Sequence, residues 1–387
     1  MKKHTQCPVC LSVKSQPLLS LKNFPIFQHP VPKETTIEGP YTVDLDYQLC
    51  EECGHGYQKE YNQRVLENLY SHHYYTPRPA DVGVESTQAF VESLSKSIPQ
   101  LKEFESILEV GCSCGEVLDV LSSLVPNAKI AALEPNTEAR KVAGSKGYEM
   151  YSEFFGLAFT TDHNRQYDFI FSRHVIEHIF DFKDFLEATK RLSTENTILA
   201  LETPCLDSAL SSNNMTGFHV EHISYFSRRS LQILLAKHGW YLEKEDITRA
   251  GNLIMYFKQG ERSQALATFP ANSETFQYTI QSKRSALIEK IKGSNKKLVM
   301  WGAGAGGRIQ MSFIETIPNA IVDSNPNKVS RYYAGLPSLN IEIVEEWVEA
   351  HKKEQDSWLM LISSMFVNEI KEKLTELQWK GEILVAS

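Results

Sequence analysis

The sequence has 387 residues, of which 42 % are hydrophobic and 23 % are charged, and these values are typical of a soluble globular chain with two or three domains. Its formal net charge of −8 disfavours general affinity for nucleic acid or anionic membranes. No window approaches the roughly 18 uninterrupted apolar residues of a membrane-spanning helix, so no membrane segment is expected.

The first residues, Met1–Pro8, are polar and contain no apolar stretch of the kind that a secretory signal needs. We therefore expect a cytoplasmic protein. The chain contains seven cysteines, and an odd number without a signal segment disfavours a disulfide framework.

Four of the cysteines form two C-x₂-C pairs, Cys7 with Cys10 and Cys50 with Cys53. Each pair can place two thiolates on one side of a tight turn, and two pairs complete a tetrahedral set of sulfur ligands. Because four protein ligands leave no open position, we predict a structural zinc ion. The ion would add folding free energy to a segment with little apolar core. The alternatives are unrelated surface cysteines or redox chemistry.

Helix-like and strand-like segments alternate from about residue 85 to residue 260. The predicted helices cover 86–101, 116–124 and 231–238, and the predicted strands cover 106–110, 129–133, 167–171 and 196–201. Strands that alternate with helices in this way indicate an α/β protein with a parallel, doubly wound sheet.

A second series of the same kind follows a polar stretch near 261–280. Helices are predicted over 276–292, 344–352 and 367–377, and strands before the glycine-rich turn 301–308 and over 320–323, 358–363 and 382–386. This series indicates a second, Rossmann-like α/β domain. The predicted domains are a zinc-binding module at 1–75, a core at 76–265 and the C-terminal domain at 266–387.

The turn Glu109-Val-Gly-Cys-Ser-Cys-Gly115 joins a predicted strand to a predicted helix. Its glycines allow the backbone to turn sharply and to approach a ligand closely, and the amides that open the helix favour a carboxylate or another anion. Dinucleotide-binding folds use the same device, so the turn alone does not identify the ligand. At the end of the next strand, Glu134 can accept the hydroxyls of an adenosine ribose.

A third segment, Tyr167–His178, contains D-F-I-F-S-R-H-V-I-E-H. With the turn and Glu134, it makes the chain resemble class I methyltransferases. In these, E-V-G-x-x-x-G binds the methionine part of S-adenosylmethionine, an acidic residue binds the ribose, and D-x-I-x-x-x-x-V-x-E-H marks the fourth strand. The residues assigned to the cofactor are Glu109, Gly111, Ser113, Gly115, Glu134 and His174.

The segment Thr216–Ser227 is rich in groups that hold or transfer protons, among them His219, Glu221 and His222. It follows the predicted strand 196–201, so we expect it at the carboxyl edge of the sheet, where ligands bind in open α/β folds. Histidine suits proton transfer because its charge changes near neutral pH. The alternative is a loop of structural, hydrogen-bonded histidines.

The four cysteines, the methyltransferase core, the E-H-x-x-Y-F-S segment Glu221–Ser227 and the second glycine turn occur together in one group. The whole chain resembles the sugar C-methyltransferases of deoxysugar pathways, which act on nucleotide-linked keto-sugars. Their C-terminal Rossmann-like domain binds no S-adenosylmethionine. The resemblance implies methyl transfer to the carbon α to the ketone of a nucleotide-linked 4-keto-deoxysugar, after a base has removed the α proton and an enolate has formed.

By similarity, His222 is the general base and Glu221 is an orienting neighbour. His178 is the candidate for holding the keto-sugar or its enolate, and His174 is a weaker candidate for the same pocket. Members of the family often carry a tyrosine three residues before the base, where this chain has His219. Its imidazole could make the same hydrogen bond, or the substrate could differ.

Several alternatives stay open. The chain could be an O- or N-methyltransferase for another small molecule, or a non-catalytic module whose cysteine knuckles recruit a partner. The aromatic pair Tyr74 and Tyr75 could close over the ligands or fix the zinc module to the core. Asp323, after the second glycine turn, could mark another adenosine site. The sequence does not fix the oligomeric state, and a monomer is favoured.

Overall fold

The computed structural model describes residues 2–33, 35, 40–70, 80–212, 217–248, 251–269, 273–336, 338–364 and 366–386, without the side chains of 80–85 and 273. By contacts between residues the chain forms two compact units. The first comprises Met1–Leu18, Tyr47–Gly217 and Glu221–Ser273, and the second comprises Leu19–Asp46, Phe218–Val220 and Glu274–Ser387. The predicted three-domain division stays a prediction, and its boundary at 75/76 lies outside the described residues, as do Tyr74 and Tyr75.

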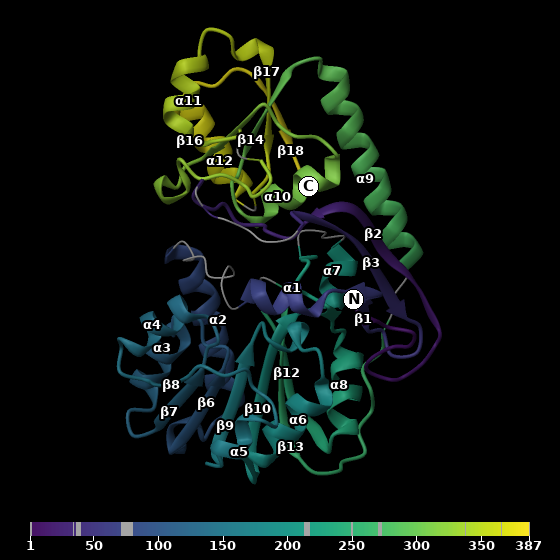
Figure 1. Ribbon diagram of the computed structural model, residues 1–387, viewed down its shortest axis with the longest axis vertical. Helices are drawn as coiled ribbons and strands as arrows, with labels where there is room; N and C mark the ends of the chain where they lie inside the picture. The colour runs from purple at the N-terminus through teal and green to yellow at the C-terminus, as the bar shows by residue number, and fades with distance from the viewer. Residues whose placement is uncertain are drawn as a thin grey trace. The chain divides into compact units, whose positions relative to one another are not determined.

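A seven-stranded sheet with the order β12-β13-β10-β9-β6-β7-β8 is the centre of the first unit (Figure 1). Its strands are β6 Ser106–Val110, β7 Lys129–Leu133, β8 Glu149–Tyr151, β9 Tyr167–Arg173, β10 Ser193–Pro204, β12 Trp240–Ile247 and β13 Asn252–Gln259. The helices of this unit are α1 Gln63–Asn68, α2 Ala80–Ser97, α3 Glu116–Leu124, α4 Thr137–Gly144, α5 Phe159–Asp162, α6 Phe182–Arg191, α7 Leu206–Ser212 and α8 Arg228–Lys237. The predicted α/β class is confirmed.

The sheet is mixed, which corrects the prediction of a parallel one. Strand β13 is antiparallel to both of its neighbours, β10 and β12, and the other adjacent pairs are parallel. Only the few residues between Ile247 and Asn252 join β12 to β13, and so short a connection permits only an antiparallel pair. The sequence analysis did not predict these two strands.

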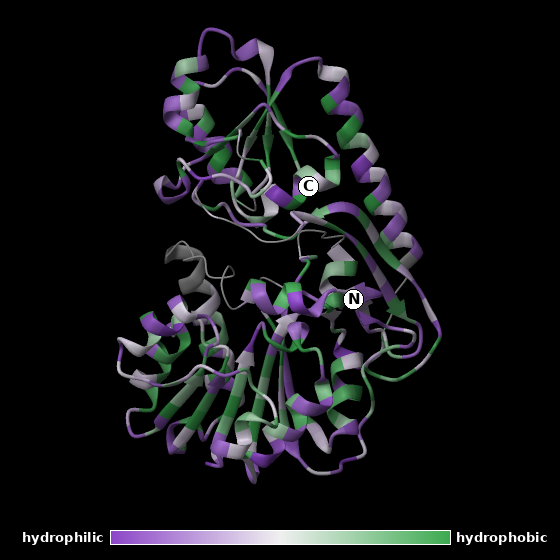
Figure 2. Ribbon diagram, in the orientation of Figure 1, coloured by the Kyte–Doolittle hydropathy of each residue, from purple (hydrophilic) through white to green (hydrophobic). Residues whose placement is uncertain are grey.

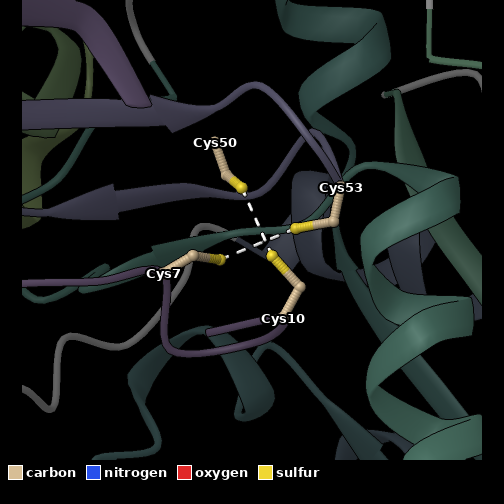
Figure 3. Close-up of side chains that lie close together, drawn as sticks. All are labelled: Cys7, Cys10, Cys50 and Cys53. Carbon is tan, nitrogen blue, oxygen red and sulfur yellow. Dashed lines mark hydrogen bonds between the residues drawn. The ribbon is translucent and has the colours of Figure 1, made fainter. Parts of the chain in front are cut away.

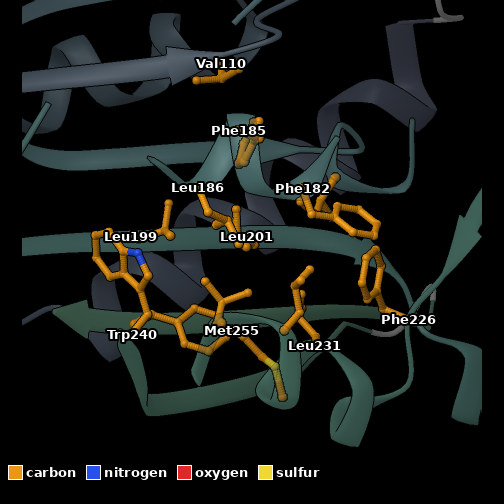
Figure 4. Packing of buried hydrophobic residues seen from close by; sticks show 14 of the residues in the cluster. Val110, Phe182, Phe185, Leu186, Leu199, Leu201, Phe226, Leu231, Trp240 and Met255 are labelled. Carbon is orange, nitrogen blue, oxygen red and sulfur yellow. The ribbon is translucent and has the colours of Figure 1, made fainter. Parts of the chain in front are cut away.

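Apolar side chains cover both faces of the sheet. Along β9, Phe169 and Phe171 belong to one cluster of buried residues, whereas Ile170 belongs to another, as the alternation of side chains along a strand requires. Figure 4 shows the second cluster, in which the ring of Phe182 packs against that of Phe226. Hydrophobic residues accordingly follow the strands in Figure 2.

Shorter strands form two small sheets outside the seven-stranded sheet, and one of these strands ends at Cys50. The strands are β1 Lys2–Lys3 paired with β5 Glu60–Tyr61, and a four-stranded sheet of β2 Ser15–Pro25, β3 Thr42–Cys50, β4 Gly56–Gln58 and β11 Ser224–Tyr225 in the order β11-β4-β3-β2. Strand β3 ends at Cys50, and β11 begins two residues after His222. The sheet therefore links the cysteine pairs to the predicted histidine loop, although these elements are far apart in the sequence.

The second unit contains a five-stranded, fully parallel sheet of order β16-β15-β14-β17-β18, which confirms the second α/β fold. Its strands are β14 Lys297–Trp301, β15 Ala320–Asp323, β16 Ile341–Ile343, β17 Trp358–Ile362 and β18 Glu382–Val385. Its helices are α9 Ser273–Ser294, α10 Ala305–Ile314, α11 Val344–His351 and α12 Val367–Glu376. Across the described part of the chain, no helix combines the length and the apolar character that crossing a bilayer would require.

Candidate active site and metal site

The glycine turn after β6 has a backbone that favours glycine. Gly111 and Gly115 have φ angles of 79° and 78°, in the left-handed region. A Cβ on Gly111 would lie 2.5 Å from Cγ2 of Val175, which follows β9. The turn thus lies where β6 meets β9, and the chain order of the strands reverses there. Ligands bind at such a switch point in open α/β sheets.

Glu134 is held against this turn by two backbone amides. Its Oε2 accepts from the amide of Ser113 and its Oε1 from that of Asn136, each at 2.8 Å. The side chain is buried, and burial raises the pKa of its carboxyl. The structure therefore brings the turn and the predicted ribose acceptor together.

A pocket with an empty volume of about 420 Å³, part of it open to solvent, lies beside the turn. Its lining includes Glu109, Gly111, Ser113 and His174 from the predicted cofactor set, together with Glu116 and Arg173. Glu109 is only 2 % exposed, and burial raises the pKa of its carboxyl to about 8. Among the described residues, Oε2 of Glu109 has no hydrogen-bond partner. The lining thus combines the carboxyl groups of Glu109 and Glu116 with the cation of Arg173.

His174 connects this pocket to two buried carboxylates that the sequence analysis did not identify as part of the site. It has a φ of 53°, and its Nδ1 lies 3.4 Å from Oε1 of Glu177. Its Nε2 lies 3.8 Å from Oε1 of Glu202, which also forms an ion pair with Arg173. Glu177 and Glu202 therefore fix the segment that follows β9.

His178 and His222 form a pair, with ring centroids 4.8 Å apart and an interplanar angle of 64°. Nitrogen atoms of both rings and a carboxylate oxygen of Glu177 lie within 4.8 Å of one another. Glu177 is 1 % exposed, and although burial opposes its ionisation, its interaction with His174 lowers its pKa. An ionised carboxylate favours the protonated form of a neighbouring imidazole, so Glu177 opposes the effect of burial, which lowers the pKa of His178.

Tyr70 fixes the orientation of His178. Its hydroxyl lies 2.7 Å from Nδ1 of His178 and donates to the carbonyl oxygen of Glu221 at 2.9 Å. Nδ1 of His178 also lies 3.0 Å from the carbonyl oxygen of Glu221, which can only accept, so these contacts favour the tautomer with the proton on Nδ1 and with Nε2 as the acceptor. Burial lowers the pKa of His178, which favours this neutral form. Tyr70 is not among the site residues that were predicted from the sequence.

The loop that carries Glu221 and His222 is held through its backbone. The carbonyl of His222 accepts from the hydroxyl of Tyr47 at 3.0 Å and from Nε2 of Gln58 at 3.1 Å. Glu221 is buried, and burial raises the pKa of its carboxyl to about 7. His219 belongs to the second unit, where its Nδ1 lies 2.5 Å from Oε1 of Gln28. The role assigned to His219 stays a prediction.

The four cysteines of the N-terminal pairs converge, as Figure 3 shows. The sulfur of Cys7 lies 3.6 Å from that of Cys53, the sulfur of Cys10 lies 3.4 Å from that of Cys50, and all four lie within 4.8 Å of one another. Tetrahedral zinc with Zn–S bonds of about 2.3 Å separates its sulfur ligands by about 3.8 Å, so the cluster fits a zinc ion with four thiolate ligands.

This cysteine cluster is part of the core rather than a separate body. Cys7, Cys50 and Cys53 are buried with Phe182 and Phe226 in one cluster of apolar residues. The amine of Lys237, in α8, also donates to the carbonyl of Val9 at 2.8 Å. An ion bound here would therefore support both the loop before α8 and the sheet beneath it.

Two family models match the chain. Residues 85–245 match the model of a methyltransferase domain. Residues 236–387 match the model of the C-methyltransferase C-terminal domain. This region is therefore similar to the C-terminal domain of C-methyltransferases.

The chain is similar to the C-methyltransferase NovU of Streptomyces niveus, with 23 % identity over 240 residues, which are 60 % of this chain and 55 % of that protein. It thus spans about half the length of this curated relative. A solved SAM-dependent methyltransferase from Aquifex aeolicus is 16 % identical and matches 51 % of this chain and 98 % of its own, with a TM-score of 0.36. The plantazolicin methyltransferase BpumL in complex with SAH is 12 % identical and matches 51 % of this chain and 95 % of its own, with a TM-score of 0.39.

Proposed function

We propose that the protein is an S-adenosylmethionine-dependent C-methyltransferase whose acceptor is a nucleotide-linked 4-keto-deoxysugar. The observation that carries this proposal is the pair His178–His222, which lies beside Glu177. Glu177 in turn contacts His174, which lines the donor pocket. The match to the C-methyltransferase C-terminal domain supports transfer to carbon. The sugar class rests on the family resemblance described above.

On the donor side, Glu134 is the acceptor for the ribose hydroxyls, and the turn Gly111–Gly115 faces the methionine part. Glu109 and Glu116 in the pocket favour the positive charge of the ligand. When bound, S-adenosylmethionine supplies an electrophilic methyl group. The chain's own contribution is to orient that group toward the acceptor carbon.

On the acceptor side, a carbon α to a ketone becomes a nucleophile only after it loses a proton. His222 takes that proton, and the electron pair of the broken C–H bond moves toward the ketone oxygen to give an enolate. The negative charge of Glu177 stabilises the imidazolium that forms. The enolate carbon then forms the bond to the methyl group, whose bonding pair to sulfur stays with the departing thioether.

The ketone oxygen needs a hydrogen-bond donor while it carries the negative charge of the enolate. Glu221, whose pKa burial raises to about 7, is partly protonated at neutral pH and can donate a hydrogen bond. When neutral, His178 accepts through Nε2 and so can bind a hydroxyl group of the methyl acceptor, which donates to it. Once His178 is protonated, it donates a hydrogen bond to the enolate. Tyr70 fixes the ring for either role.

We propose further that Cys7, Cys10, Cys50 and Cys53 bind a structural zinc ion. The burial of three of these residues and the complete set of four sulfur ligands support a site with no open position. The ion takes no part in proton transfer.

The test is to incubate the full chain with S-adenosylmethionine carrying a ¹³C-methyl group and a panel of nucleotide-linked 4-keto-sugars. Carbon–proton correlation spectra then report the atom that carries the label. A label on the carbon α to the ketone is expected. A label on oxygen or nitrogen would instead identify an O- or N-methyltransferase.

A further inference from the structure

The second unit repeats the arrangement of the donor site. Strand β14 leads into the turn Gly302–Gly307, and Asp323 ends the neighbouring strand β15. Oδ2 of Asp323 accepts from the amide of Ala303 at 2.8 Å, and Oδ1 accepts from the amide of Asn325 at 2.9 Å. Glu134 makes the same two kinds of hydrogen bond in the first unit. The turn also lies at a switch point, because β14 lies between β15 and β17.

The charge around this second turn is opposite to that of the first. Helix α3, after the donor turn, has Glu116 and Asp119 in its first turn, whereas α10 has no acidic residue there and no side-chain N-cap. The amine of Lys328 lies 3.0 Å from Oδ2 of Asp323 and 4.0 Å from the position of a Cβ on Gly304. A helix start without acidic side chains and with a nearby cation favours an anion. This argues against a second site for the cationic methyl donor.

Arg308, in the first turn of α10, is a buried cation without a counter-charge. It is 7 % exposed, and within the described ranges its buried Nε has no hydrogen-bond partner. Side chains of a helix point back toward its N-terminus, which directs this guanidinium to the glycine turn. An unpaired buried charge is unfavourable, and the guanidinium group matches the geometry of phosphate oxygens.

Tyr333 supports this placement of Arg308. Its hydroxyl donates to the carbonyl of Gly304 at 2.7 Å, so the ring ends at the turn. Burial raises the pKa of Tyr333, Asp323 raises it further, and the charge of Arg308 lowers it. Arg308 and Asp323 therefore both act on a hydroxyl that contacts the turn.

The turn also has room for a ligand. A Cβ on Gly306 would meet no described atom within 4 Å, and one on Gly304 would meet only Lys328. On its other side the turn is closed, since a Cβ on Gly302 would lie 2.4 Å from the carbonyl oxygen of Ser363. A ligand therefore has access to the backbone amides from the side of Gly304 and Gly306.

We propose that the turn Gly302–Gly307, with Arg308 and Lys328, binds a phosphate group of a nucleotide. The site itself stands on the second unit alone. The further assignment of this phosphate to the nucleotide of the methyl acceptor rests on the proposed function.

Calorimetric titration of the full chain tests the site with uridine diphosphate, inorganic pyrophosphate and, as a separate ligand, S-adenosylhomocysteine. Uridine diphosphate and pyrophosphate should both bind. Arg308→Met should weaken both at least tenfold, since it removes a charge-assisted contact. Arg284→Gln is the matched control, because Arg284 lies in the same unit but is paired with Glu315, and it should stay within twofold. The affinity for S-adenosylhomocysteine should not change in either variant.

Lys328→Gln, on a partly exposed side chain, provides the same test if Arg308→Met does not fold, and it should weaken both phosphate ligands several-fold. No binding of either ligand, or equal affinities in the Arg308, Lys328 and Arg284 variants, would overturn the proposal. Binding of pyrophosphate without uridine diphosphate would overturn the assignment to a nucleotide. Intact uridine diphosphate binding without any methyl transfer would count against the proposed function alone.

Discussion

Nδ1 of His174 lies 3.4 Å from Oε1 of Glu177, and this contact connects the two halves of the proposed reaction. His174 lines the donor pocket, and Glu177 lies within the cluster that contains His178 and His222. His174 and Glu177 therefore connect the proposed donor pocket to the histidine pair that we propose accepts the proton. Such proximity is what transfer to an enolate requires, because the enolate must meet the methyl group before it is reprotonated.

His222→Ala should abolish most turnover while the affinity for S-adenosylhomocysteine stays within twofold. General bases contribute roughly 10²–10⁴-fold to rates, so the rate constant should fall by at least about a hundredfold. Steady-state rates and calorimetry measure the two effects. The control is His163→Gln, a histidine of the same unit that packs on Phe159 and lies outside the histidine pair. Equal rates in both variants would remove His222 from the mechanism.

Tyr70→Phe should lower kcat about tenfold through the orientation of His178, because it removes one hydroxyl with two hydrogen bonds. The limb of the pH–rate profile that reports the histidine pair should also shift, which a purely structural defect would not cause. Tyr61→Phe, in which the ring stacked on Phe180 is kept, is the control and should keep the wild-type profile. An unshifted profile in the Tyr70 variant would contradict the positioning role.

Cys50→Ser should lower both the zinc content and the soluble yield. The wild-type chain should hold a single zinc ion, and loss of one ligand weakens a site whose binding free energy contributes to folding. Cys205→Ser changes a buried cysteine outside the quartet and should leave the zinc content unchanged. Metal analysis by mass spectrometry and thermal unfolding measure both effects. A full complement of zinc in the Cys50 variant would show that the quartet is not the site.

Gly111→Ala should weaken the binding of S-adenosylhomocysteine at least tenfold, because the new methyl group would lie 2.5 Å from the side chain of Val175. Gly147→Ala is a matched control, since Gly147 also has a positive φ, 91°, but a Cβ there meets no described atom within 4 Å. Both variants lose about 1–2 kcal/mol of stability from the left-handed backbone. Calorimetry should show weaker binding of S-adenosylhomocysteine in the Gly111 variant than in the Gly147 variant. Equal affinities would mean that binding of the ligand does not depend on the turn.

The affinity for S-adenosylhomocysteine should increase with pH between about 6.5 and 8.5. Burial raises the pKa of Glu109 to about 8, so the carboxyl is mainly neutral at lower pH, and its ionised form attracts the ligand's ammonium group. The change is at most about tenfold per pH unit. Glu109→Gln should flatten this dependence.

The same pKa shift affects the ligand-free protein in the opposite sense. Glu109 ionises more readily when unfolded, with a usual pKa of 4.5, than when buried. Stability should therefore fall as the pH rises from about 4.5 to about 8, and Glu109→Gln should remove that part of the decrease. Chemical denaturation at several pH values measures it, and an equal decrease in the variant would assign the effect to other groups.

The geometry of the proposed donor site could be predicted from the sequence because its signals are local. A strand, a glycine turn and an acid after the next strand specify one turn–helix–strand unit, and Ser113 does contact Glu134. The cysteine pairs were equally readable, since two C-x₂-C spacings imply four convergent thiolates. The bond between Tyr70 and His178 joins residues 108 positions apart, and no spacing or periodicity indicates it.

The other differences between the sequence prediction and the structure also arise from contacts between residues far apart in the sequence. Strand β13 pairs with β12 as a hairpin. Its sequence lacks a clear alternating pattern because β13 is buried on both faces. Glu202 reads in the sequence as an ordinary strand residue, and only the fold reveals its ion pair with Arg173. Long-range pairing of polar groups is decided by topology, which local sequence patterns do not contain.

Solvent deuterium exchange tests the histidine mechanism most directly. The full chain is incubated in D₂O with a nucleotide-linked 4-keto-sugar that it methylates, in the absence of S-adenosylmethionine, and proton spectra follow the signal of the carbon α to the ketone. We predict that the wild-type chain exchanges this proton and that His222→Ala does not. Retention of the proton by the wild-type chain, with an acceptor that it demonstrably methylates, would contradict proton abstraction before methyl transfer.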